Sequence, residues 1–161
     1  MHTLQLENAE FLPHVCQFVN EGHSVSIRAK GNSMRPFVES DRDVAVLTKC
    51  EKYKVGDVVL AEITPGHYVL HRIDRIDGDA VTLRGDGNVR GTEHCTLSDI
   101  KAITSQFIRK GKTWNLQTSR VWKVYSKVWV AMLPVRRYLL AAYRLLWRHE
   151  LPQRVTRLFK K

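Results

Sequence analysis

Gly31-Asn32-Ser33-Met34-Arg35-Pro36-Phe37 connects two apolar runs that are typical of β-strands. Gly31 allows the backbone to turn without a Cβ clash, and Pro36 fixes its own φ and pushes the residue before it toward extended geometry. The apolar side chain of Met34 can anchor this loop in a core. The sequence therefore predicts a stiff corner between two strands that holds one hydroxyl, that of Ser33.

A histidine lies inside a later strand-like run, Tyr68-Val69-Leu70-His71-Arg72-Ile73. A serine hydroxyl becomes a good nucleophile only when a base takes its proton, and neutral imidazole is the commonest such base. Ser33 and His71 are 38 positions apart, so only folding can bring them together. Taken singly, each has a structural interpretation, as a loop serine and as a buried strand histidine.

Four segments in this order resemble the catalytic boxes of the type I signal peptidase superfamily, which includes self-cleaving domains of the phage-repressor type. Gly31–Pro36 resembles the box with the nucleophile, and Tyr53–Val59 resembles the Gly-Asp segment that begins a strand. His71–Ile73 resembles the general-base box, and Gly85–Asn88 resembles the Gly-Asp-x-Asn turn. The histidine matches the endoplasmic-reticulum and archaeal branch, in which it replaces the bacterial lysine.

The resemblance implies a serine endopeptidase with a catalytic dyad of Ser33 and His71. Such an enzyme would cut a signal or leader segment from a protein or small peptide precursor, with small side chains just before the cut. The substrate would bind extended, along a strand edge beside Ser33. Two alternatives stay open: a catalytically degenerate binding module, and a self-processing regulator of the repressor type.

The resemblance offers two candidates for the acid that orients the imidazole. Asp86 is the first choice, because it occupies the aspartate position of the Gly-Asp-x-Asn turn. The histidine branch usually carries a further aspartate about six residues later, but here Thr92 stands at that position and Glu93 follows. Glu93 is therefore the second choice. Asp86 has an alternative interpretation as an ordinary Asp-Gly hairpin turn.

The loop residues Gly31, Asn32 and Ser33 are the candidates for the oxyanion hole. The backbone N–H of Ser33 can supply one hydrogen-bond donor. Many members of the superfamily place a serine hydroxyl two residues before the nucleophile, whereas Gly31 has no side chain. The second donor is therefore either a backbone N–H or the side chain of Asn32.

The rest of the chain predicts a mainly β fold with a short amphipathic helix at Asn8–Asn20 that covers one end of the sheet. Turn residues separate the expected strands. These are Ser24–Ala29, Asp43–Thr48, Asp57–Ile63, Tyr68–Ile76, Ala80–Arg84 and Ile100–Arg109. This spacing agrees with the coiled, partly closed β-sheet that the resemblance implies.

Charge divides the chain into two parts. Residues 1–108 hold 12 basic and 15 acidic residues, a net charge of −3, whereas residues 109–161 hold 14 basic residues and one acid, a net charge of +13. We therefore expect a catalytic domain over 1–110 and a basic helical appendage over 111–161. The domain has no electrostatic footprint for nucleic acid, which makes that partner unlikely.

The appendage predicts a helix from Ser119 to about His149, divided near Pro134. Basic residues occupy one arc, and the opposite arc is apolar, with tryptophans beside it. The apolar residues are Val128, Met132, Leu139, Tyr143 and Leu146, and the tryptophans are Trp122, Trp129 and Trp147. Two central arginines disfavour a membrane span, so residues 119–161 are expected to lie on an anionic membrane surface or to pack on protein.

No residue pattern indicates a metal or a cofactor, and the three widely spaced cysteines fit free thiols. Residues 1–20 contain no apolar core of signal-peptide length. We therefore expect a cytoplasmic protein, peripheral at the inner face of the cytoplasmic membrane if the appendage binds lipid.

Overall fold

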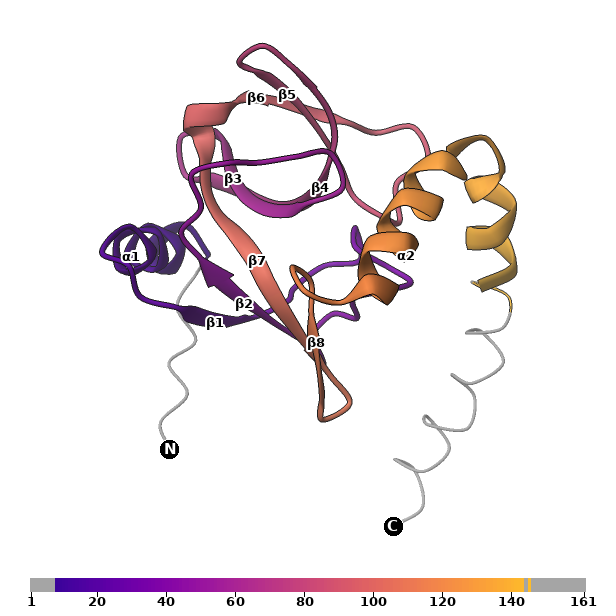
Figure 1. The fold of residues 1–161 in the computed structure, drawn as a ribbon, viewed down its shortest axis with the longest axis horizontal. Helices are drawn as coiled ribbons and strands as arrows, with labels where there is room; N and C mark the ends of the chain where they lie inside the picture. The colour runs from indigo at the N-terminus through magenta and orange to yellow at the C-terminus, as the bar shows by residue number, and fades with distance from the viewer. Residues whose placement is uncertain (1–7, 144, 146–161) are drawn as a thin grey trace.

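The computed structural model describes residues 8–143 and 145 (Figure 1). In this part of the chain eight strands form one antiparallel sheet in the order β1-β2-β7-β3-β4-β5-β6, and β8 pairs with β7. The elements are α1 (Asn8–Asn20), β1 (Val25–Arg28), β2 (Val44–Thr48), β3 (Val58–Thr64), β4 (His67–Asp77), β5 (Ala80–Arg84), β6 (Glu93–Thr96), the 3₁₀ turn η1 (Leu97–Asp99), β7 (Ile100–Arg109), β8 (Lys112–Asn115) and α2 (Arg120–Ala131).

The predicted mainly β fold is confirmed, together with the N-terminal helix and all six expected strands. Two short strands were missed, β6 and β8. Both contain four mostly polar residues without an apolar alternation, so neither produces a strand signal by itself. Pairing with β5 and β7 supplies the hydrogen bonds that hold them in the sheet.

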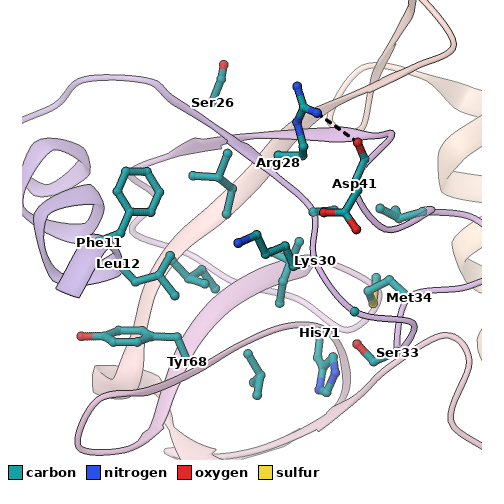
Figure 2. A pocket seen from close by; sticks show the side chains of 17 residues that line it. Phe11, Leu12, Ser26, Arg28, Lys30, Ser33, Met34, Asp41, Tyr68 and His71 are labelled. Atoms are coloured by element: carbon teal, nitrogen blue, oxygen red, sulfur yellow. Dashed lines mark hydrogen bonds between the residues drawn. The ribbon is translucent and has the colours of Figure 1, made fainter. Parts of the chain in front are cut away.

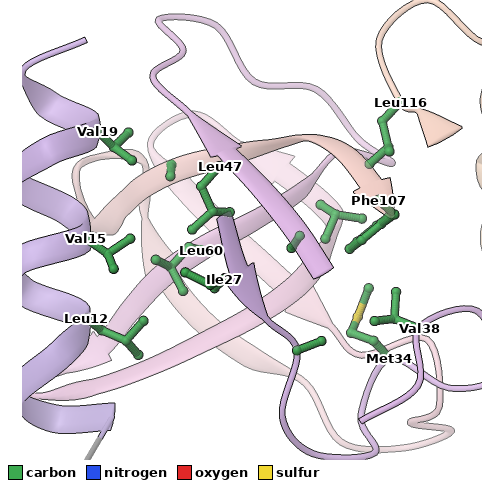
Figure 3. Packing of buried hydrophobic residues seen from close by; sticks show 14 of the residues in the cluster. Leu12, Val15, Val19, Ile27, Met34, Val38, Leu47, Leu60, Phe107 and Leu116 are labelled. Carbon is green, nitrogen blue, oxygen red and sulfur yellow. The ribbon is translucent and has the colours of Figure 1, made fainter. Parts of the chain in front are cut away.

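The sheet separates two apolar clusters, because successive side chains of each strand point to opposite faces. The first cluster holds side chains from α1, β1, β2 and β7 and from the loop that carries Ser33 (Figure 3). Leu12, Val15 and Val19 of α1 pack into it, so α1 covers the sheet as predicted. The second cluster lies on the other face and includes Val59 and Ile73.

The part after β7 is closely joined to the sheet. β8 continues the sheet to Asn115, beyond the expected domain boundary at residue 110, and Leu116 and Trp122 belong to the first apolar cluster. Trp122 of α2 packs against the rings of Phe37 and Phe107 (centroid distances 4.2 and 5.8 Å). The C-terminal part therefore includes a helix that packs on the sheet.

The helix divides as expected. α2 ends at Ala131, and helical structure resumes over residues 133–143, with Pro134 in its first turn, where the missing N–H costs nothing. Of the expected apolar face, Val128 and Leu139 are exposed, whereas the neighbouring Trp122 and Trp129 are buried. Leu146 and Trp147 lie outside the described residues. None of the described helices is long and apolar enough to cross a membrane.

Candidate active site

A cleft of about 490 Å³ opens between β1 and the first half of β4 (Figure 2). Ser33 and His71 lie next to each other at one end of it, and Phe11 and Leu12 of α1 lie with Tyr68 at the other end. The structure thus brings the two residues together, although they come from different parts of the sequence.

The loop that carries Ser33 is fixed at several points. Gly31 has a φ of 90°, which strongly favours glycine, and its N–H donates to Ser40 Oγ at 3.1 Å. The carbonyl oxygen of Ser33 accepts a hydrogen bond from the N–H of Gly87 at 2.7 Å. Met34 is buried in the first apolar cluster, as the sequence predicts. These contacts hold the Ser33 side chain, which is half-buried, at the cleft.

His71 is 4% exposed, and its Nδ1 lies 2.8 Å from Oε2 of Glu93 on β6. Burial disfavours the imidazolium and lowers the pKa of His71 below 6.5, while the Glu93 carboxylate partly opposes this shift. The imidazole is therefore neutral at pH 7, with Nδ1 carrying the proton toward Glu93. That leaves Nε2 as the nitrogen that can accept a proton.

Asp86 pairs with Arg72. Its two carboxylate oxygens accept hydrogen bonds from Arg72 Nε and Nη2 at 2.8 and 2.7 Å, and both side chains are almost fully buried. Because Arg72 follows His71 directly in β4, the two side chains leave opposite faces of the strand. Of the two acids proposed from the sequence, the structure thus places Glu93 against His71 and Asp86 against Arg72.

Arg72 connects the catalytic strand to two other segments. Its Nη1 donates to the carbonyl oxygen of Gly56 at 2.8 Å and to Ser126 Oγ of α2 at 2.7 Å. Its guanidinium also lies over the Trp122 ring, 5.1 Å from the centroid. Sequence reasoning included Arg72 only as part of the general-base box. The available signal was a long cation in the segment Val69-Leu70-His71-Arg72-Ile73, between apolar residues, where a buried charge needs a partner.

The three residues proposed for the oxyanion hole, Gly31, Asn32 and Ser33, lie in different environments. The N–H of Gly31 is already used by Ser40, and Gly31 and Asn32 are both exposed. The carbonyl oxygen of Asn32 accepts from the N–H of Arg35 at 3.2 Å. Gly31 therefore contributes a turn, and the N–H of Ser33 and the backbone N–H or side chain of Asn32 stay candidates for binding an oxyanion.

The Gly85–Asn88 turn packs directly behind the loop that carries Ser33. A Cβ at Gly85 would lie 2.5 Å from the Ser33 carbonyl oxygen and 3.0 Å from Ser33 Cβ. These distances are too short for a carbon atom, so only glycine fits here without moving Ser33. The close packing gives the Gly-Asp-x-Asn turn a steric role in addition to the buried carboxylate that it supplies.

Gly85→Ala should therefore displace Ser33 and lower kcat/KM for peptide cleavage by about a hundredfold, since misplacement of about 1 Å has effects of that size. Gly91→Ala is the matched control, because its Cβ would meet only Asn88 Nδ2, at 4.0 Å, and should leave cleavage within about twofold. The measurement is steady-state kinetics on a cleaved peptide. Equal activity of both variants would contradict the packing argument.

Among the described residues, no group of three or more histidine, cysteine and acidic side chains is placed to hold a metal ion. Ser33 and His71 bring a hydroxyl and an imidazole group to the cleft, the groups used in nucleophilic chemistry.

The model of a family described as Peptidase S24-like matches residues 2–117. The matched part contains the sheet, the cleft and the residues Ser33, His71, Asp86 and Glu93. The helix α2 and residues 133–143 lie outside it. No curated protein matches the chain.

Proposed function

Because the chain belongs to the Peptidase S24-like family, a family of serine peptidases, we propose that it is an endopeptidase with Ser33 as nucleophile and His71 as general base. The observation that supports this assignment is the meeting of Ser33 with a buried, neutral His71 in one cleft (Figure 2). Glu93 acts as a positioning residue, which replaces our first choice, Asp86. A histidine base would agree with membership of the histidine branch of the signal peptidase superfamily, which we propose together with the dyad.

The mechanism uses the usual steps of acyl transfer. Ser33 Oγ attacks the scissile carbonyl carbon while His71 Nε2 takes the hydroxyl proton, and Glu93 stabilises the imidazolium that forms. The imidazolium then gives its proton to the leaving amine as the C–N bond breaks. Water, deprotonated by the same imidazole, attacks the acyl-enzyme and releases the acid product and Ser33.

The cleft suits an extended peptide. β1 pairs only with β2 among the described strands, and the β4 residues 67–71 pair only with β3. Each segment therefore presents an unpaired strand edge along the cleft, to which a peptide backbone can add. The side chains of Ile27, Met34 and Leu60 give part of the lining an apolar surface. We propose the signal or leader segment of a protein or small peptide as substrate, with small apolar residues before the cut.

Glu93→Gln should lower kcat/KM by about a hundredfold or more, because the amide can fix the wrong imidazole tautomer and cannot stabilise imidazolium. Cleavage requires neutral His71, so the wild-type rate should fall as pH drops through a value below 6.5. Glu93 raises the pKa of His71, so its removal should move this acidic limb to still lower pH.

The check is a pH profile of kcat/KM for wild type, Glu93→Gln and the exposed control Glu51→Gln, which should match wild type. A purely structural Glu93 would lower the melting temperature and leave the position of the acidic limb unchanged. That result would refute the positioning role.

A peptide library digested by the wild-type protein, with Ser33→Ala as the blank, tests the function as a whole. Mass spectrometry should find new termini only with the wild type, and the aligned cleavage sites should report the preferred side chains. Identical products from both proteins would exclude the peptidase. Self-cleavage of the intact chain during the incubation would instead support the repressor-type alternative.

A further inference from the structure

A second groove, of about 730 Å³, lies between α2 and the sheet and shares no lining residue with the catalytic cleft. Its lining includes the apolar side chains of Val58, Ile103, Leu116 and Trp122. Its size is that of a site for a small molecule or for part of a lipid.

Four exposed lysines line this groove from both sides. Lys52 and Lys54 precede β3, and Lys123 and Lys127 belong to α2. Its only acidic lining residue is Asp57, which accepts a hydrogen bond from the backbone N–H of Lys54 and whose pKa is raised by burial. The groove thus combines an apolar interior with a strongly positive edge, which fits an amphiphile that has an anionic head.

One polar atom in the groove has no partner. The hydroxyl of Thr104 is buried, with the residue 1% exposed, and Oγ1 makes no hydrogen bond with the described residues. A buried hydroxyl without a partner costs about 1–3 kcal/mol. An ester carbonyl of a lipid entering the groove could accept a hydrogen bond from Thr104.

The outer face of α2 continues this surface. Val121, Val124 and Val128 fall on one stripe of the helix and are 66, 60 and 48% exposed. Lys123 and Lys127 lie between this stripe and the groove by helical phase, and α2 contains no acidic residue. Exposed valines beside lysines are typical of a helix that lies in a lipid interface.

We propose that the groove and the outer face of α2 bind an anionic phospholipid at a membrane surface. The valines contact the acyl region, the lysines bind the headgroup phosphate, and one acyl chain enters the groove. Charge complementarity selects this occupant, because residues 109–161 carry a net charge of +13. The surface is separate from the peptidase cleft, so the proposal does not depend on the proposed function.

The test is density-gradient flotation of the full-length protein with vesicles of phosphatidylcholine, with or without phosphatidylglycerol. The protein should float with the vesicles that contain phosphatidylglycerol and not with those of phosphatidylcholine alone. High salt should abolish this binding. Each lysine near an anionic surface contributes about a fivefold gain in binding, so Lys123→Gln with Lys127→Gln should weaken it about thirtyfold. Val124→Ser with Val128→Ser should weaken it at least about tenfold.

The matched control is Lys110→Gln with Lys112→Gln, two exposed lysines of the β7–β8 hairpin with the same charge change. It should weaken binding about twofold or less, because the effect of a charge falls off within a Debye length. Thr104→Val should weaken binding about threefold without lowering the melting temperature.

Three results would overturn the proposal. The first is no flotation with anionic vesicles at low salt. The second is an equal loss of vesicle binding in both lysine double variants, which would show that net charge, and not the position of the lysines, determines binding. The third is a stable dimer without vesicles that Val124→Ser with Val128→Ser dissociates, which would assign the valine stripe to a second copy of the chain.

Discussion

Replacing Ser33 by alanine should lower kcat/KM for peptide cleavage by at least about a thousandfold, because removal of a nucleophile leaves only binding and oxyanion stabilisation. The variant should fold normally. The contacts that hold the loop come from the backbone of Ser33 and from Met34, and alanine preserves both. The measurement is steady-state kinetics on a peptide taken from the library digestion, together with thermal unfolding.

Ser26→Ala provides the matched control, because Ser26 lines the same cleft from β1 and is exposed. It should keep kcat within about twofold of wild type. A Ser33→Ala variant that retains a tenth or more of the wild-type rate would contradict the nucleophile assignment. A melting temperature that falls together with the activity would show a structural role for this hydroxyl.

Asp86→Asn should destabilise the protein by about 3–5 kcal/mol, since it leaves the charge of Arg72 buried without its partner. Both side chains are almost fully buried, so water cannot replace the carboxylate. Asp77→Asn is the matched control. Asp77 pairs with Arg75 on the surface, where both side chains are more than 70% exposed, and its loss should cost less than about 1 kcal/mol.

Urea unfolding of wild type, both single variants and the double variant Arg72→Met with Asp86→Leu measures these costs. The double variant should recover part of the loss, because it removes the isolated charge. Recovery should stay incomplete, since the Gly56 carbonyl and Ser126 hydroxyl lose their donor. If Asp86→Asn cost no more than Asp77→Asn, the buried pair would not be a determinant of stability.

The fold was predictable because its signals are local. The apolar patterns of α1 and of the six predicted strands, with glycine and proline at their ends, could be recognised without knowledge of the contacts. The strands β6 and β8 were not predictable in this way. They are held by partners β5 and β7, and short polar strands depend on such pairing.

The choice between Asp86 and Glu93 as the partner of His71 could not be made from local sequence patterns. Ile73, Leu83 and Glu93 are cross-strand partners in β4, β5 and β6, so Glu93 lies on the face of β4 that also carries His71. This relation depends on β6, which the sequence pattern did not reveal. Without it, the match to the Gly-Asp-x-Asn turn favoured Asp86.

The C-terminal helix was predicted as an element, whereas the burial of its individual side chains is known only from the structure. Helical phase divides basic from apolar side chains, yet it cannot tell which apolar side chains find a partner. In the structure Trp122 fills a space between Phe37 and Phe107, because large rings gain more from burial than valines do. The smaller valines of α2 are left exposed as a result.

The pairing of Ser33 with His71 is tested most directly by placing a thiol at position 33 and measuring its rate of alkylation, because this measurement needs no substrate. Ser33→Cys is made with Cys16, Cys50 and Cys95 replaced by serine, and its reaction with iodoacetamide is followed against pH, with and without His71→Gln. Imidazole within proton-transfer reach should bring the thiol pKa about one unit or more below 8.5, and His71→Gln should abolish this shift. A thiol pKa near 8.5 in both proteins would contradict the pairing of Ser33 with His71.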